Sequence, residues 1–167
     1  MTSQELSYAL KQHGDYLASQ PGGRRFVLGR RSLRGRDLRG RDLRLASFRF
    51  GDLTDAQLDY CDCTRADFRS ATLAGCGFQQ TSLAGAAFVG ATLNWHSPDL
   101  VGGYLYARAK TIEQQRLAAW IGHSLLGPWP NLDLLEMSPE WPWALRVLTA
   151  HAEATGDRAF PFHLARV

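Results

Sequence analysis

The sequence predicts a repeat solenoid with a helical segment on either side of it. Apolar residues recur every five positions between Leu28 and Leu93, and the run has no skip. A helix turns one face inward about every 3.6 residues and a strand about every 2, so neither explains this spacing. A fixed internal period is typical of a solenoid, because each unit buries its apolar face only by stacking on its neighbours. The fourteen members of this central column are Leu28, Leu33, Leu38, Leu43, Phe48, Leu53, Leu58, Cys63, Phe68, Leu73, Phe78, Leu83, Phe88 and Leu93.

A second column lies two positions before the first. From Ala46 onward it holds only small residues. Two positions in five are therefore expected to face inward, and the others are rich in Gly, Arg and other polar residues. The second column consists of Phe26, Arg31, Arg36, Arg41, Ala46, Gly51, Ala56, Cys61, Ala66, Ala71, Cys76, Thr81, Ala86 and Ala91.

The stretches ADFRS, ATLAG, AAFVG and ATLNW resemble the pentapeptide-repeat family, whose consensus is A(D/N)LXX. The resemblance covers residues 26–95 and implies a mainly β fold, a right-handed quadrilateral β-helix of about 3.5 coils. With four sides, residues 20 apart stack in adjacent coils. Phe48, Phe68 and Phe88 then share one face, as tight packing of like on like favours.

Residues 1–25 are expected to form a helix and linker that cap the first coil. Thr2 and Glu5 have the spacing of a capping box, and Pro21-Gly22-Gly23 ends the helical pattern. The apolar stripe that would face the coil consists of Leu6, Ala9, Leu10 and Leu17.

Residues 96–167 are expected to form a helical lobe, because the five-residue period stops after Trp95. Helix starts are predicted at Ser97-Pro98-Asp99, at Thr111 with Gln114, and at Ser138-Pro139-Glu140, with an end near Gly156. The layout of helix, repeats and Trp-rich tail resembles that of pentapeptide-repeat proteins encoded by phages and prophages. The core candidates of the lobe are Leu100, Leu105, Ile112, Leu117, Trp120, Ile121, Leu125, Leu134, Leu135, Trp143, Leu145 and Leu148.

The first coil is strongly basic. Residues 24–50 contain ten arginines against two aspartates, although the whole chain has a formal charge of only +3. Arg31, Arg36 and Arg41 occupy the column meant for small residues, so their side chains are expected to leave across the open end of the solenoid. One interpretation is that they cap the fold by bonding helix carboxylates or C-terminal carbonyls; the other is a functional anion site. The outward-facing arginines are Arg34, Arg39, Arg44 and Arg49.

Leu45, Phe50, Tyr60 and Trp95 fall in outward positions, where polar or small residues are usual. They pack either under the terminal helices or against a partner or a second copy of the chain. We predict that at least one of Leu45, Phe50 and Tyr60 stays exposed on a contact face.

The sequence predicts no catalytic site, cofactor or metal. The three cysteines fall in inward columns, which favours buried reduced thiols, and the five histidines show no paired ligand spacing. Most of the aspartates that follow the basic region are expected to bond the backbone of their own turns. These groups are Cys61, Cys63 and Cys76, and Asp52, Asp55, Asp59, Asp62 and Asp67.

A non-enzymatic protein-binding module is therefore the predicted function. The resemblance implies a phage-type factor that binds and modulates or inhibits a host protein, such as a DNA-processing or defence enzyme. Some members of the family bind type II topoisomerases by resembling DNA in shape and negative charge, but the basic first coil disagrees with such mimicry. The alternative is binding of a nucleic-acid phosphate backbone by the arginine-rich coil. The chain is expected to be cytoplasmic, without a membrane partner, and monomeric or homodimeric.

Overall fold

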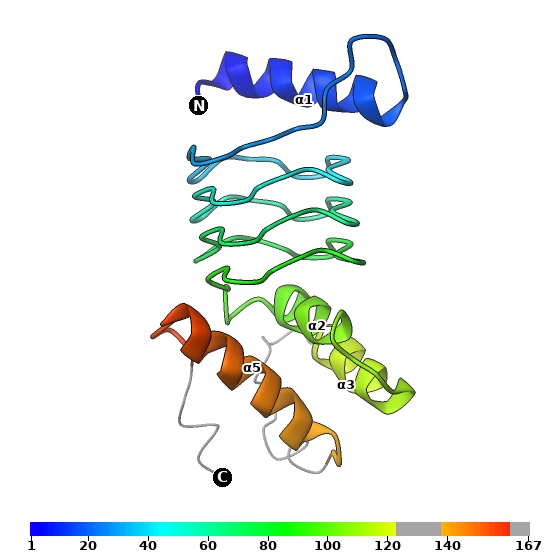
Figure 1. Cartoon of the computed structure of the whole chain (residues 1–167), viewed down its shortest axis with the longest axis vertical. Helices are drawn as coiled ribbons and strands as arrows, with labels where there is room; N and C mark the ends of the chain where they lie inside the picture. The colour runs from blue at the N-terminus through cyan, green and yellow to red at the C-terminus, as the bar shows by residue number, and fades with distance from the viewer. Residues whose placement is uncertain (123–137, 161–167) are drawn as a thin grey trace.

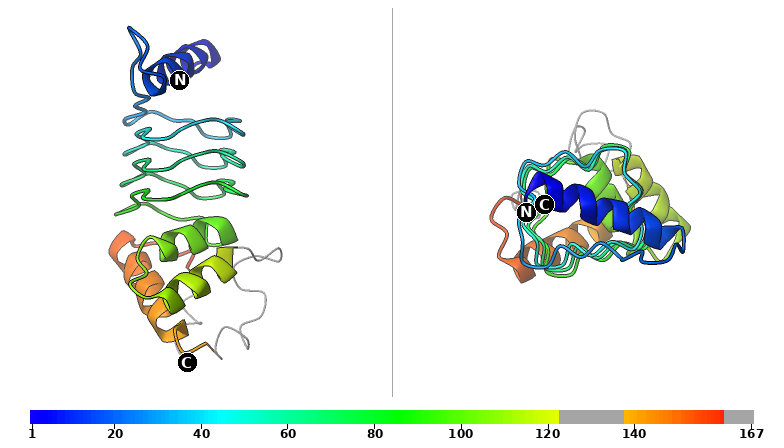
Figure 2. Two further views of the ribbon diagram at one scale, coloured as in Figure 1. Left: turned by 90° about the vertical axis from the view of Figure 1, so that its right-hand side faces the viewer. Right: turned by 90° about the horizontal axis from the view of Figure 1, so that it is seen from above.

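The computed structural model describes residues 1–122 and 138–160, in which a stack of coils lies between two helical ends. Helix α1 (Ser3–Leu17) lies across the first coil, and α2 (Pro98–Tyr106), α3 (Ile112–Gly122) and α5 (Trp141–Thr155) lie beyond the last one (Figure 1). Seen along the stack, α1 crosses the mouth of the coils (Figure 2). Helices thus lie over both ends of the solenoid and cover part of its unpaired edges.

Each coil takes 20 residues, as the sequence predicts. Parallel bridges join residues 20 apart, from Val27 with Ser47 to Thr72 with Thr92, at four places per circuit. Around each bridge the backbone bonds run both ways: Asp52 N–H donates to Arg31 O at 3.1 Å, and Leu33 N–H donates to Asp52 O at 2.8 Å.

The expectation of a mainly β chain needs a correction. The residues that the structure describes form only isolated bridges along the coils and no extended strand, and their regular elements are helices. The reason lies in the period, because a turn follows every bridge and leaves each face too short for a ladder of several residues.

The turns share one backbone conformation. In each turn, a residue two positions after the central one has a positive φ, between 51° at Gln80 and 72° at Gly90. The next residue closes the turn, as when Arg36 N–H donates to Leu33 O at 2.9 Å. A positive φ at the third turn residue is what a type II turn requires, and glycine adopts it at least cost. Glycine fills five of these twelve positions: 35, 40, 75, 85 and 90.

The core is a column of stacked rings enclosed by the leucines of the other faces. Phe68 lies 5.0 Å from Phe48 and 5.2 Å from Phe88 between ring centroids, with interplanar angles of 7° and 5°. The predicted phenylalanine stack is therefore confirmed. Phe26 extends it toward α1, and Tyr104 of α2 continues it edge-on below Phe88 at 6.1 Å.

Helix α1 is fastened to the first coil by a buried histidine. Thr2 and Glu5 form the predicted capping box, which starts the helix. His13 is buried, and its Nδ1 accepts a hydrogen bond from Phe26 N–H at 3.0 Å. Gly23 is required where the chain turns back, because a Cβ there would collide with the backbone of Tyr16.

Helices α2 and α3 begin where the sequence predicts, whereas α5 begins at Trp141 with Glu140 rather than Ser138 at its N-cap. Ser97 Oγ accepts from Leu100 N–H at 3.3 Å, and Thr111 Oγ1 accepts from Gln114 N–H at 3.2 Å. A second buried histidine, His151, donates from Nε2 to Ala91 O at 2.6 Å, and Tyr104 Oη lies 2.8 Å from its Nδ1. These contacts attach α5 and α2 to the last coil.

The predicted core of this lobe is correct in part. Two candidates are wrong, since Ile112 and Trp120 of α3 are exposed, whereas Leu117 and Ile121 of the same helix are buried. Trp143 and Leu145 are half-buried. Leu100, Leu105, Leu117, Ile121 and Leu148 are buried, and Leu125, Leu134 and Leu135 lie outside the described residues.

The helices among the described residues are too short or too polar to cross a bilayer.

Candidate protein-binding face

The outward arginines surround the coil instead of gathering on one face. Arg34, Arg39, Arg44 and Arg49 follow one another at intervals of five residues, and a full circuit takes 20, so each stands at a different corner. The four arginines therefore do not form a single flat surface that could bind phosphates.

Three of these arginines are paired with aspartates. Arg39 bonds Asp37 in bidentate fashion, with Nε–Oδ1 and Nη2–Oδ2 distances of 2.9 and 2.8 Å. Arg44 bonds Asp42 in the same way at 2.8 and 2.7 Å, and Arg34 Nε lies 3.5 Å from Oδ2 of Asp52. The guanidinium hydrogen bonds are the main cause that lowers the pKa of the Asp37 carboxyl to about 2. The repeated Asp-x-Arg spacing could have indicated the Asp37–Arg39 and Asp42–Arg44 pairs from the sequence alone.

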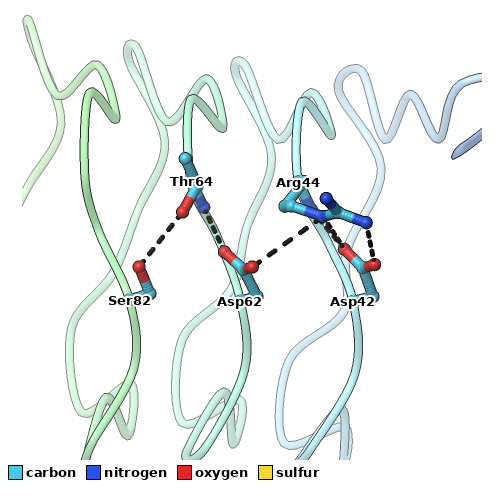
Figure 3. Close-up of polar contacts among 5 residues, drawn as sticks. All are labelled: Asp42, Arg44, Asp62, Thr64 and Ser82. Atoms are coloured by element: carbon cyan, nitrogen blue, oxygen red, sulfur yellow. Dashed lines mark hydrogen bonds and ion pairs between the residues drawn. The ribbon is translucent and has the colours of Figure 1, made fainter.

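Arg44 begins a chain of polar contacts that crosses one face of the solenoid (Figure 3). Besides Asp42 it approaches Asp62 of the next coil, with Nε 3.8 Å from Oδ2. Asp62 accepts from Thr64 N–H at 3.0 Å, and Thr64 Oγ1 lies 3.0 Å from Ser82 Oγ. We call these five residues the polar ladder and the side of the solenoid that carries them the ladder face.

Two exposed side chains flank the ladder face. Tyr60 occupies the turn immediately before the Asp62 segment, and Leu45 occupies the turn after Arg44. Their exposed fractions are 54% and 37%. An aromatic ring on one corner and an aliphatic side chain on the other thus border a polar centre.

Phe50 stands at the next corner and carries two cations. The guanidinium carbon of Arg30 lies 5.1 Å from the ring centroid and that of Arg49 lies 4.8 Å from it. Phe50 is 41% exposed. All three of the predicted side chains are therefore exposed, whereas Trp95 is buried by the helical lobe, where Phe160 packs against it at 4.8 Å between ring centroids.

Leu45, Phe50 and Tyr60 hold the left-handed turn conformation, with φ of 63°, 62° and 62°. This conformation costs a bulky L-residue about 1–2 kcal/mol, which glycine at the equivalent turns does not incur. Strained residues of this kind cluster at functional positions.

The three arginines of the small-residue column do not converge. Arg31 donates from Nε to Leu28 O at 2.8 Å and from Nη2 to Val27 O at 2.7 Å. Arg36 donates to Ser3 Oγ at 3.0 Å and to Met1 O at 3.2 Å. Arg41 makes no side-chain hydrogen bond or ion pair with the residues that the structure describes.

The oxygens that these arginines bond are thus carbonyls of the first coil and groups at the start of the chain. They are neither carboxylates of the capping helix nor carbonyls at its C-terminus, which was the expected arrangement. The three side chains leave from three successive faces, and this spacing does not favour one shared anion site.

The thiols and carboxylates show structural roles. Cys61 Sγ donates to Leu38 O at 3.0 Å, and burial raises the pKa of the Cys76 thiol. The pKa of Cys63 is also raised, first by its hydrogen bond with Cys61. Asp52, Asp62 and Asp67 each accept the N–H two residues on, as turn aspartates do. Within residues 1–122 and 138–160, no group of three or more metal-ligating side chains comes together.

The repeat segment matches a known family model. Residues 61–95 match the model for pentapeptide repeats in eight copies. None of the curated proteins matches the chain.

Several solved structures resemble part of the chain. Rfr23, a pentapeptide repeat protein from the cyanobacterium Cyanothece 51142, is 27% identical over 38% of this chain and 41% of its own, with a TM-score of 0.34. A pentapeptide repeat protein from Nostoc Pcc 7120 is 28% identical over 46% of this chain and 71% of its own, with a TM-score of 0.19. One from the thylakoid lumen of Arabidopsis thaliana is 26% identical over 41% and 65%, with a TM-score of 0.15. The match to Rfr23 thus spans less than half of that protein's length.

Proposed function

Because the chain belongs to the pentapeptide-repeat family, we propose that it is a non-enzymatic protein-binding module whose contact surface is the ladder face with Leu45 and Tyr60 at its edges. The right-handed course of its coils is inferred from the same family. Members of the family generally serve as interaction modules, and a rigid stack closed at both ends by helices suits that role.

The observation that carries the proposal is the pair of exposed, bulky turn residues. Leu45 and Tyr60 occupy positions where glycine would relieve the backbone, yet their side chains are directed outward. Exposed aromatic side chains such as Tyr60 are enriched at protein interfaces and often act as anchors there. The polar ladder supplies such groups, since Asp42, Arg44 and Asp62 satisfy one another before a partner arrives.

Nucleic-acid binding is the weaker alternative. Phosphate binding needs free cationic groups, and bidentate partners already neutralise Arg39 and Arg44. The other seven arginines of residues 24–50 have no ion pair to the described residues, but Arg31 and Arg36 already donate to oxygens of the first coil and the start of the chain, and Arg30 and Arg49 lie at a single corner around Phe50.

We further propose that the partner is a host protein that the chain modulates or inhibits. A DNA-processing or defence enzyme, such as a type II topoisomerase, is one candidate. Support for this narrower proposal comes from the family resemblance and the phage-like layout of the sequence. The cytoplasmic location and the monomeric or homodimeric state stay predictions of the sequence.

A capture experiment with matched variants tests the proposal. The wild-type chain, Leu45→Gly/Tyr60→Gly and a control, Asp55→Gly/Ser70→Gly, are immobilised and exposed to bacterial lysate, and bound proteins are quantified by mass spectrometry. Both variants place glycine at left-handed turns, so each should remain folded by circular dichroism.

A protein partner should be retained by the wild type and the control, and lost from Leu45→Gly/Tyr60→Gly. Equal recovery on all three proteins would refute the ladder face as the contact. Capture that falls steeply with salt and disappears after nuclease treatment would favour nucleic acid instead.

A further inference from the structure

An open pocket lies between the last coil and the C-terminal helices, where Ser82 at the end of the polar ladder is one of its lining residues. Its volume is about 1120 Å³. One wall is the lower edge of residues 76–85, and the opposite wall comes from the start and end of α2 and from the small residues of α3. Gly102, Gly103, Ala118 and Gly122 keep that second wall low.

The coil edge in this pocket has unused backbone groups. One coil earlier, Cys63 N–H donates to Ser82 O at 2.9 Å and Cys61 O accepts from Ser82 N–H at 3.0 Å. The equivalent groups 20 residues on are Leu83 N–H and Thr81 O, and neither has a hydrogen-bond partner among the described residues. The pocket therefore exposes the same donor and acceptor pair that each coil uses to bind the next one.

The charge of the pocket has one sign. Asp59 and Asp99 line it, and the described lining residues include no lysine or arginine. Each aspartate is held in place by a backbone N–H: Asp59 Oδ1 accepts from Gln79 at 2.8 Å, and Asp99 Oδ1 accepts from Gln80 at 3.1 Å. The two carboxylates are thus fixed on adjacent residues of the same corner.

We propose that this pocket binds an extended, basic peptide segment of a partner protein, which pairs with the edge at Ser82 as a further strand. The proposal rests on the protein-binding function above and adds a second contact with a defined chemistry. Backbone pairing at an open edge supplies affinity without much sequence preference. Lysine or arginine side chains that alternate along the segment would reach Asp59 and Asp99, while the intervening side chains would lie against the exposed ring of Tyr106.

The pocket suits an extended backbone better than a helix. Thr81 O and Leu83 N–H lie on either side of Ser82, which is the arrangement that one residue of a parallel strand pairs with. A helix uses its own backbone groups internally and would leave these two unpaired. Ser82, which lies between these two groups, is exposed, whereas the side chain of Leu83 is buried beside Gly103 of α2.

Fluorescence anisotropy with defined probes tests this proposal. The probe is a fluorescein-labelled nonapeptide in which valine alternates with lysine or arginine, and its counterpart carries glutamate at the basic positions. The variant Asp59→Asn/Asp99→Asn keeps the oxygen acceptors and removes the charges. The control Asp15→Asn/Glu153→Gln removes the same charge from half-buried Asp15 of α1 and exposed Glu153 of α5, both outside the pocket.

The basic peptide should bind the wild type and the control equally, and bind Asp59→Asn/Asp99→Asn at least tenfold more weakly. A basic peptide with N-methyl groups on alternate backbone nitrogens should lose affinity in the register that blocks pairing. Equal binding of the glutamate peptide, equal binding to both double variants, or unchanged binding of both N-methylated registers would overturn the proposal.

Peptide binding to the Leu45→Gly/Tyr60→Gly variant distinguishes a failure of this proposal from a failure of the proposed function. Leu45→Gly/Tyr60→Gly should bind the basic peptide as the wild type does, because its substitutions lie outside the pocket. If the peptide fails to bind the wild type while lysate capture still depends on Leu45 and Tyr60, the pocket proposal alone is refuted.

Discussion

Replacing Phe68 by leucine should destabilise the solenoid more than the same change at Phe78, although both rings are buried. Phe68 stacks on Phe48 and Phe88 at 5.0 and 5.2 Å and meets Phe78 edge-on at 5.8 Å. Phe78 makes only that last contact among the ring pairs of the described residues. Each aromatic pair contributes about 0.5–1.5 kcal/mol beyond burial, so the loss of two further pairs at Phe68 amounts to roughly 1–3 kcal/mol.

Urea unfolding followed by circular dichroism measures this difference. Leucine keeps most of the ring's volume, so the cavity and burial costs of Phe68→Leu and Phe78→Leu are similar and cancel in the comparison. The slopes of the two transitions should match, so that the shift in midpoint reports stability alone. Equal losses of unfolding free energy would show that the stacked column contributes nothing beyond burial and would refute the reasoning.

Three further changes probe the caps and the helical lobe. Burial is the main cause that lowers the pKa of His151 from its usual 6.5. The stability that neutral His151 contributes is therefore complete above about pH 6.5 and is lost as the pH falls through the pKa of the folded state. His151→Gln should flatten this part of the pH profile of the unfolding free energy, and an unchanged profile would contradict the assignment. Gly102→Ala should lower the melting temperature, because the new Cβ would collide with the backbone of α3, at a cost of about 1–3 kcal/mol. Gly103→Ala would place its Cβ 2.9 Å from Cδ1 and 3.3 Å from Cβ of Leu83, contacts with a side chain rather than a backbone, and should cost less. Similar melting temperatures for the two variants would mean that the helices can separate without cost. Arg36→Ala should cost about 1–2 kcal/mol in a thermal unfolding experiment because it loses two hydrogen bonds to the N-terminal segment, while Arg41→Ala should not; an equal effect of both would point to charge rather than to these bonds.

The repeat could be predicted from the sequence because its signal is redundant. Each of the fourteen units has an apolar residue at the same inward position, so a less typical residue such as Cys63 does not hide the period. The 20-residue coil also followed, since Phe48, Phe68 and Phe88 mark one face. The capping box of α1 was visible for a different reason, because Thr2 and Glu5 bond each other within four residues of the chain.

The contacts of the two buried histidines were not predicted, because their partners are distant in the sequence. The aspartate–arginine pairs were not predicted either, although their two-residue spacing is visible in the sequence. His13 and His151 read as isolated residues, and only folding brings them to Phe26 N–H and Ala91 O. The exposure of Trp120 depends on which side of α3 faces α2, which the close approach at Gly102 decides and the apolar pattern of α3 does not.

The exposed turn residues could be placed in outward positions from the period alone. What they contact could not, because a partner leaves no pattern in one chain. The cost of their backbone conformation also required the structure, since a positive φ at Tyr60 is not visible in its side chain.

Site-specific photocrosslinking at the ladder face tests the central claim most directly. A photoreactive phenylalanine derivative is placed at position 60 in one protein and at position 55, an exposed turn on another corner, in a second. After irradiation in lysate, the position 60 protein should form one dominant crosslinked species that unlabelled wild type competes away, and the position 55 protein should not. The same crosslinked species from both positions, or none that competes at position 60, would contradict the assignment of the ladder face as the binding surface.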